Sequence, residues 1–215
     1  MKWQMRKIVL LAVTISVLFL SMLVYYVTYP FLFQNKAFFL SQFCLFELQK
    51  HMRELSILRI MIAGLLLFTV IIMSKRIWKQ FFYSKRLKRN LVSITRKGKQ
   101  VYVLSTLQIT AFTIGLFRPK IVISEGMFQA FSEEEIDAIV LHEEYHQKNR
   151  DPLKLFFFTL LAEGMMYIPI LKGMLQRYHV YQELSADKYA MQKMKSSFEL
   201  GSALLKLIKI KTMEN

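Results

Sequence analysis

Two long apolar runs at the start of the chain predict membrane-spanning helices. No charged residue occurs between positions 8 and 34, and roughly 20 apolar residues are enough for a helix to cross the hydrocarbon core of a bilayer. A second apolar run covers 55–73 and carries one charge near its start, Arg59, whose long side chain can reach the membrane interface. We therefore expect a transmembrane hairpin over residues 1–74, with spans at about 8–28 and 55–73.

The first run has an alternative interpretation as a cleaved signal peptide. Lys2, Arg6 and Lys7 form the basic segment that precedes such a peptide. However, the run is long for a signal peptide, and it ends in aromatic residues and Pro30 without the small residues of a cleavage site. A retained span is the better interpretation.

Shorter runs rich in β-branched residues follow at 101–105, 109–114 and 121–124. Gly98, Gly115, Pro119 and Gly126 separate them as turns, so a small sheet is expected, one edge of which is a candidate for pairing with an extended peptide. A helix is then predicted from Ser132 to about residue 149. Ser132 is followed by three glutamates, the pattern of a capping box in an acidic first turn.

Composition and charge support a membrane protein. Hydrophobic residues make up 54% of the 215 residues, which is high for a soluble domain. The net charge of +15 is concentrated, since ten Lys and Arg and no acidic residue lie between positions 75 and 100. By the positive-inside bias, this basic segment and the N-terminus are expected on the cytoplasmic side. Its aromatic residues would also suit nucleic acid, but its place directly after a span favours anionic lipid at residues 75–99, and no nucleic-acid partner is expected.

The predicted helix carries an H-E-x-x-H motif formed by His142, Glu143 and His146. Four residues are just over one helical turn, so both imidazoles project from one face, close enough to share a metal, with Glu143 beside them to polarise a water. With a single cysteine in the chain, any metal must be held by histidines and carboxylates. The ligand pattern is that of a hydrolytic zinc site. A charged, solvated helix face is the alternative, but the apolar residues 138–141 run directly into the motif.

A third ligand is expected from a second helix further along the chain. Glu183 is the preferred candidate because Asp187 lies one turn later on the same face. There, Asp187 can accept a hydrogen bond from the free ring nitrogen of a ligating histidine. His179, one turn before Glu183, is the alternative ligand.

A third apolar run, at 153–171, is predicted not to cross the membrane. A single crossing would place Glu183 on the opposite side of the bilayer from His142 and His146. Two crossings would need about 40 residues, and 36 separate His146 from Glu183. Gly164 and Pro169 are expected to break this run, which we predict packs on the motif helix or dips into the interface. The segment 198–210 is expected to form another amphipathic helix.

The residues from about 100 to 195 resemble the BlaR/MecR-type family of membrane metallopeptidases, and more distantly the HtpX and CAAX-prenyl endopeptidases. The similar segments are 117–124, the motif helix, 150–153 and 183–187. The resemblance implies a gluzincin fold, zinc ligands at His142, His146 and Glu183, and Glu143 as general base. The antibiotic sensors of this family carry an extracellular penicillin-binding domain, which these residues do not include, so a β-lactam sensing role is not predicted.

The predicted fold class is thus a mainly α membrane protein with two N-terminal transmembrane helices. These helices are followed by a basic juxtamembrane linker at 75–100. The rest, 101–215, is predicted to be a cytoplasmic α+β zinc peptidase domain of the gluzincin type, with a small sheet and interfacial helices. The predicted function is hydrolysis of peptide bonds in a cytoplasmic or juxtamembrane protein, as part of regulatory proteolysis, by a multi-pass protein of the cell membrane. Two alternatives are a non-catalytic membrane regulator that binds a repressor or membrane partner, and a basic membrane-surface module.

Overall fold

The computed structural model describes residues 2–33, 45–88, 91–96, 98–194, 201–203 and 205–206. Its first two helices are α1 (Lys2–Phe33) and α2 (Leu45–Lys88). Within them, Trp3–Thr28 and Ile57–Tyr83 are long and apolar enough to cross a membrane. Most of their large apolar side chains are exposed, which distinguishes them from the core helices of a soluble protein. Both predicted spans overlap these two segments.

The predicted linker at 75–100 needs correction, because most of it is regular structure. Helix α2 continues to Lys88, and strand β1 (Leu91–Arg96) follows almost at once. The sequence from 75 to 88 contains no glycine or proline, and its Lys, Arg and Gln are good helix formers, so nothing ends the helix at the membrane surface. Strand β1 was not predicted; it is stabilised by antiparallel pairing with β2 (Lys99–Leu104).

The sheet is mixed, with strand order β1-β2-β4-β3. Strand β4 (Lys120–Ser124) pairs in parallel with β2 and antiparallel with β3 (Ala111–Ile114). The turn between β3 and β4 requires a glycine, because Gly115 has a φ of 110° and a Cβ there would lie 2.7 Å from the carbonyl oxygen of Arg118. Strands β2, β3 and β4 overlap the three predicted runs, β1 adds a fourth strand, and β3 is left at the edge opposite β1.

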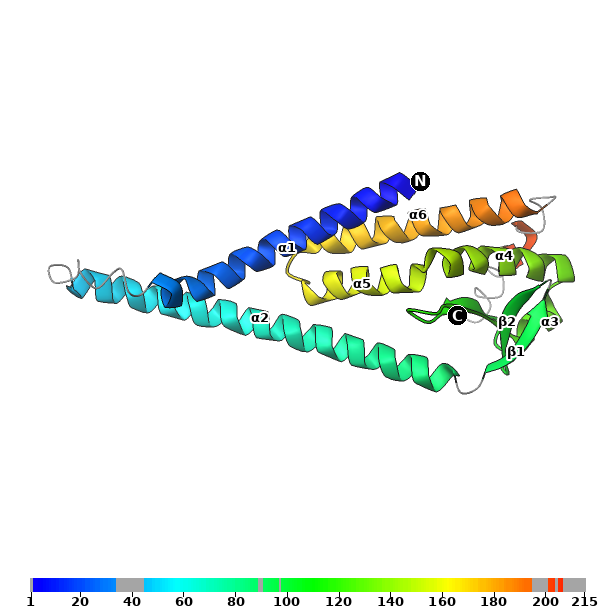
Figure 1. The fold of residues 1–215 in the computed structure, drawn as a ribbon, viewed down its shortest axis with the longest axis horizontal. Helices are drawn as coiled ribbons and strands as arrows, with labels where there is room; N and C mark the ends of the chain where they lie inside the picture. The colour runs from blue at the N-terminus through cyan, green and yellow to red at the C-terminus, as the bar shows by residue number, and fades with distance from the viewer. Residues whose placement is uncertain are drawn as a thin grey trace.

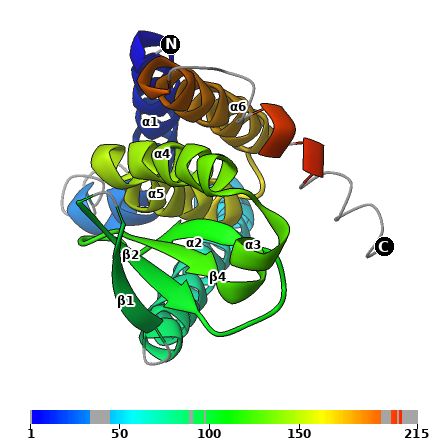
Figure 2. The same ribbon diagram turned by 90° about the vertical axis from the view of Figure 1, so that its right-hand side faces the viewer.

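Helix α4 (Glu133–Asn149) lies across the sheet after the short helix α3 (Glu125–Ala130), as Figure 2 shows. Its N-terminus has the predicted capping box, in which the Ser132 hydroxyl accepts from the Glu135 amide and the Glu135 carboxylate accepts from the Ser132 amide. The helix buries Ile136, Ile139 and Val140 in one core with residues of β2 and β4. Burial of this apolar face against the sheet also fixes the rotation of α4, so that Glu143 faces the edge strand β3 and both histidines project beside it.

The third apolar run forms a helical hairpin and not a single long helix. Helix α5 (Asp151–Gly164) ends at Gly164, and α6 (Pro169–Lys193) begins at Pro169, the two residues predicted to break the run. Figure 1 shows the hairpin between α1 and α2, which diverge from a common end. At its tip the Tyr167 hydroxyl lies 3.3 Å from that of Thr69. Because the chain reverses there, α6 returns to α4.

The predicted amphipathic helix at 198–210 lies largely outside the described residues. Residues 201–203 and 205–206 are helical. Among them, the Ser202 hydroxyl and the Lys206 ammonium donate to the Glu135 carboxylate at 2.6 and 2.7 Å, so this part of the chain docks on the first turn of α4.

Candidate metal centre

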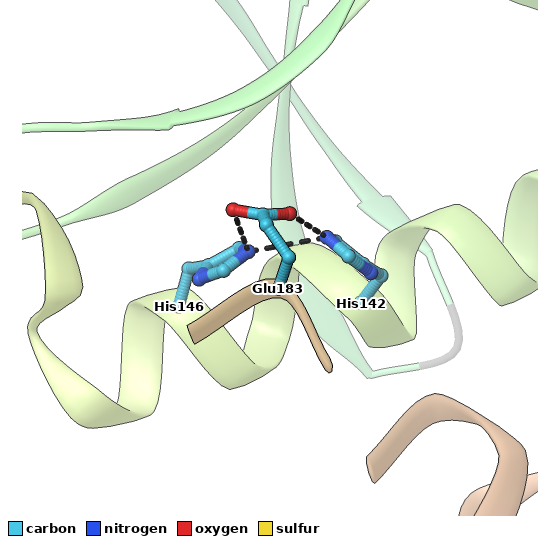
Figure 3. A group of neighbouring side chains, drawn as sticks. All are labelled: His142, His146 and Glu183. Atoms are coloured by element: carbon cyan, nitrogen blue, oxygen red, sulfur yellow. Dashed lines mark hydrogen bonds and ion pairs between the residues drawn. The ribbon is translucent and has the colours of Figure 1, made fainter. Parts of the chain in front are cut away.

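Three side chains from two helices meet at one point, as Figure 3 shows. His142 and His146 project from α4 with their Nε2 atoms 3.1 Å apart. Helix α6 brings the Glu183 carboxylate to 3.3 Å from the Nε2 atom of His142 and 3.8 Å from that of His146. One ligand atom from each residue lies within 4.8 Å of the others. The structure therefore brings together the three residues that the sequence nominated as metal ligands.

The spacing of these atoms fits a tetrahedral zinc site. Zinc binds histidine nitrogen at about 2.0–2.1 Å, so two tetrahedral nitrogen ligands lie about 3.3 Å apart. The two Nε2 atoms are 3.1 Å apart, and the nearer carboxylate oxygen is 3.3 Å from His142. With one ring proton on each Nδ1 atom, the two Nε2 lone pairs face each other, an arrangement that a shared cation stabilises. Three protein ligands also leave the fourth position of a catalytic site for water.

Each imidazole is held from behind by a separate aspartate. The Nδ1 atom of His142 lies 2.8 Å from the carboxylate of Asp187, as the sequence predicted. The Nδ1 atom of His146 lies 3.0 Å from the carboxylate of Asp151. Such carboxylates set the tautomer of a ligating histidine and raise its basicity. Both rings thus direct Nε2 toward the candidate metal position.

The role of Asp151 was missed in the sequence, although Asp151 belongs to the segment that carries the resemblance. It lies five residues after His146, a spacing that no single helix places on one face. Arg150 makes the contact possible: its left-handed conformation, with a φ of 53°, ends α4 and redirects the chain into α5. The fully buried Asp151 side chain is thereby turned back toward His146.

Glu143 lies beside the metal position and is oriented by the edge strand. Its carboxylate accepts a hydrogen bond of 2.7 Å from the Thr113 hydroxyl, which also lies 3.0 Å from the Glu143 carbonyl oxygen. The side chain is mostly buried but lines the cleft. Thr113 on β3 carried no signal in the sequence, because its contact with α4 depends on how the sheet packs against the helix.

The three candidate ligands open into a cleft of about 370 Å³. One wall is the edge strand β3, with Phe112 and Thr113, and the other is the start of α5, with Leu155 and Phe156. Arg76, in the C-terminal part of the candidate span Ile57–Tyr83, also lines this cleft. The helix that contains this span therefore contributes to the wall of the site.

The electrostatics of the centre favour a cation. Burial works to lower the pKa of His142, but hydrogen bonds to Asp187 and then Glu183, with the nearby Glu143 charge, outweigh it and raise that pKa to about 10. Burial likewise works to raise the pKa of Glu183, but the hydrogen bond to His142 and the charges of the neighbouring histidines lower it. Without a metal, a proton on His142 therefore supplies the positive charge that the surrounding carboxylates demand.

His179 lies at the margin of the centre. Its Nδ1 atom is 3.7 Å from the Glu183 carboxylate, and 53% of its side chain is exposed. It does not belong to the group of side chains that converge on the metal position. The geometry thus favours Glu183 over His179 as the third ligand, the order that the sequence suggested.

Comparison with known proteins identifies the family. The family model of the BlaR1 peptidase M56 matches residues 3–215. The chain belongs to this family. M56 peptidases are metallopeptidases, typically of the zinc class, and the His and Glu cluster of this M56 chain suits that chemistry. Family membership and the two apolar helices together make it a membrane-associated, metallopeptidase-like protein.

A characterised relative supports this assignment. The chain is 28% identical over 115 residues to "Regulatory protein BlaR1" of Bacillus licheniformis. The match covers 53% of this chain and 19% of the relative, so the chain spans a small part of that protein. The predicted BlaR/MecR-type family is confirmed.

Proposed function

We propose that this M56 chain is a zinc-dependent endopeptidase of the gluzincin type. It hydrolyses peptide bonds in a cytoplasmic or juxtamembrane protein, as a step of regulatory proteolysis. The observation that carries the proposal is the convergence of the two α4 imidazoles and the α6 carboxylate within 4.8 Å, beside the glutamate of the same motif. A binding protein without catalysis has no need of this combination.

The side chains present are suited to hydrolysis by an activated water. Zinc, when held by His142, His146 and Glu183, supplies Lewis acidity to a water and to the scissile carbonyl. Glu143 is placed to accept the proton of the attacking water and to deliver it to the leaving amine. The Thr113 hydroxyl, 2.7 Å from the Glu143 carboxylate, keeps this base directed into the cleft.

The edge strand β3 is suited to hold the substrate. It is the last strand of the sheet, so one side of its backbone lacks a strand partner within the described sheet. Phe112 and Thr113 of this strand line the cleft. A substrate that adds to this edge as an extended strand would pass its backbone over the metal position. Backbone pairing gives affinity, and side-chain contacts within the cleft give specificity.

The charges of the chain support a cytoplasmic site. Arg6 and Lys7 near the start of α1, and the basic residues beyond the apolar part of α2, lie toward the end of the molecule that carries the site. The positive-inside bias assigns that end to the cytoplasm. Trp78 and Phe81, 69% and 64% exposed, accompany the basic residues of α2. This combination is typical of a helix end that contacts anionic lipid.

The proposal is tested with the full chain in lipid nanodiscs and the variant Glu143→Gln. Membrane-fraction proteomics on cells with either protein identifies the substrate, and its cleavage is then measured in vitro. We expect the variant to keep a bound zinc while cleavage falls by about 100-fold or more, the range for loss of a general base. Glu134→Gln, the same change at an exposed position of α4, serves as the matched control and should cleave normally.

Different failures have different meanings. Unchanged cleavage by Glu143→Gln would remove Glu143 from the mechanism. A wild-type chain that binds zinc but shows no Glu143-dependent cleavage of any membrane or cytoplasmic protein would support the non-catalytic regulator. A chain without zinc would contradict the metal site itself.

A further inference from the structure

A second cavity, of about 480 Å³, lies where α1, α5 and α6 meet near the end of α4. The first turns of α1 contribute Met5, Arg6, Val9 and Leu10 to its wall. Lys154 of α5 and Tyr178 of α6 face them across the cavity. The metal centre uses none of these side chains as a ligand.

The charges around this cavity are positive. Arg6 and Lys154 come from segments far apart in the chain, yet both line it, and no acidic residue is among the described residues of its wall. Arg6 makes no ion pair within the described part of the chain. Lys154 has a loose partner in Asp151, at 3.4 Å. Two cations that are only partly compensated create a site for an anion.

The remaining wall is apolar and lies where the membrane span begins. Val9 and Leu10 belong to the candidate span Trp3–Thr28, and 67% of Leu10 is exposed. Arg6 lies one turn earlier, near the N-terminal end of that span. The cavity thus places cationic side chains beside apolar ones, at the level where the membrane span begins. A ligand that fits it has an anionic head next to an apolar tail, as an anionic membrane lipid does.

Tyr178 is a buried part of the cavity wall. It is 1% exposed, and its hydroxyl has no hydrogen-bond partner among the described residues. A buried hydroxyl without a partner is uncommon in folded proteins. The hydroxyl itself has almost no accessible surface, so a phosphate oxygen or a water would reach it only after a shift of the Tyr178 side chain toward the cavity.

From these features we propose that the cavity binds one anionic glycerophospholipid. Its phosphate lies between Arg6 and Lys154, and its acyl chains follow Val9 and Leu10 along α1. This binding site is separate from the basic surface of α2. Lipid binding at this site requires no peptidase activity, so its test is independent of the test of the proposed function.

The site would link the lipid to the metal centre through two contacts. Lys154 contacts the Asp151 carboxylate, and the other oxygen of that carboxylate accepts from His146. A lipid phosphate that draws Lys154 toward itself would leave Asp151 with His146 as its main partner. The lipid thus favours the carboxylate–histidine contact that directs Nε2 to the metal.

The test is native mass spectrometry of the detergent-solubilised full chain titrated with phosphatidylglycerol, phosphatidylcholine or inorganic phosphate. We expect the wild type to retain one phosphatidylglycerol at least tenfold more tightly than phosphatidylcholine. The double variant Arg6→Gln, Lys154→Gln should lose at least tenfold of that affinity, whereas the charge-conserving pair Arg6→Lys, Lys154→Arg should keep most of it. Lys7→Gln and Lys172→Gln remove equal charge outside the cavity and should bind like the wild type.

Several outcomes would overturn the proposal. Equal retention of both lipids would show that the headgroup charge is not recognised. Displacement of phosphatidylglycerol by millimolar inorganic phosphate would mean that the site recognises the free anion. If the Lys7 and Lys172 variants lost as much affinity for phosphatidylglycerol as the Arg6 and Lys154 variant, the effect would be one of general surface charge. The fold of Arg6→Gln, Lys154→Gln is checked by its thermal unfolding in detergent. A loss of affinity in that variant, with unfolding like the wild type and with affinity kept by the charge-conserving pair, assigns the effect to the charge at these two positions.

Discussion

The two histidines of the candidate metal centre have the same chemistry but are supported in different ways. His146 is held by Asp151, five residues later and fully buried at the junction of α4 and α5. His142 is held by Asp187, 45 residues later and 27% exposed on α6. Glu183 lies on that same helix. One half of the centre is therefore built within a continuous segment, and the other half exists only when α6 docks on α4.

This difference ties the candidate metal centre to the apolar helices that are candidate membrane spans. Helix α6 packs on α5 and on α1, where Leu171, Met174 and Tyr178 share a core with Met5 and Ala12. Glu183 and Asp187 come from the same helix, which also packs directly on α4 through Ala190 and Ala138. We infer that the position of the His142 half depends on how α6 packs, both on α4 and within the core that includes α1, whereas the His146 half is fixed at the α4–α5 junction.

The largest expected effect comes from removing either imidazole. His142→Ala and His146→Ala each leave two of three protein ligands, so both should lose most of the bound zinc when metal content is measured by mass spectrometry. His179→Ala is the matched control, because this histidine lies outside the cluster, and it should keep the metal. A zinc loss in His179→Ala equal to the others would contradict the ligand set.

Substitution of the two aspartates should have the next largest effect on zinc binding. The two variants also distinguish the His146 half of the centre from the His142 half. Asp151→Asn and Asp187→Asn should each weaken zinc affinity by about 10–100-fold, the usual effect of losing such a partner. Asp151→Asn should also lower the free energy of unfolding by about 1–3 kcal/mol, because its buried polar contacts are impaired. Asp187→Asn should lower it less, because the Asp187 carboxylate is 27% exposed and water can replace its lost contact. Equal destabilisation, measured by chemical denaturation of the metal-free protein, would remove the proposed asymmetry.

Zinc binding should release a proton from the His142 half. In the metal-free protein the pKa of His142 is raised to about 10, so the ring is protonated at pH 8 and must lose that proton to ligate. The apparent affinity for zinc should then rise by about tenfold per pH unit up to pH 10 and level off above that pH. Calorimetry in buffers of different ionisation enthalpy measures the release. Asp187→Asn, which removes the strongest of the contacts that raise this pKa, should reduce the release at pH 8.

The smallest effect is expected at the edge strand. Thr113→Val removes the hydroxyl that orients the Glu143 carboxylate while keeping the shape of the side chain. We expect kcat for the substrate to fall by about tenfold, a fraction of the 100-fold or more that general-base catalysis contributes, with zinc content unchanged. Thr95→Val, on the exposed side of β1, is the control. A loss of zinc in Thr113→Val would show that the residue supports the fold of the centre and not the base.

Much of this arrangement was predictable because it depends on local periodicity. The apolar runs, the cap at Ser132 and the projection of His142 and His146 from one face follow from helix geometry alone. The pairing of Glu183 with Asp187 used the same rule on a second helix. Even the break in the third apolar run followed from Gly164 and Pro169, combined with the requirement that Glu183 reach the histidines.

The remaining features depend on contacts between segments that are not related by any repeat. Asp151 reaches His146 because Arg150 adopts a left-handed conformation, and Thr113 reaches Glu143 because the edge of the sheet packs against α4. Strand β1 forms because β2 offers it a partner. By itself, the sequence determined which side chains could bind a metal and which helices carry them. Their meeting was decided by packing, since burial of apolar faces on different helices positions side chains that local geometry leaves independent.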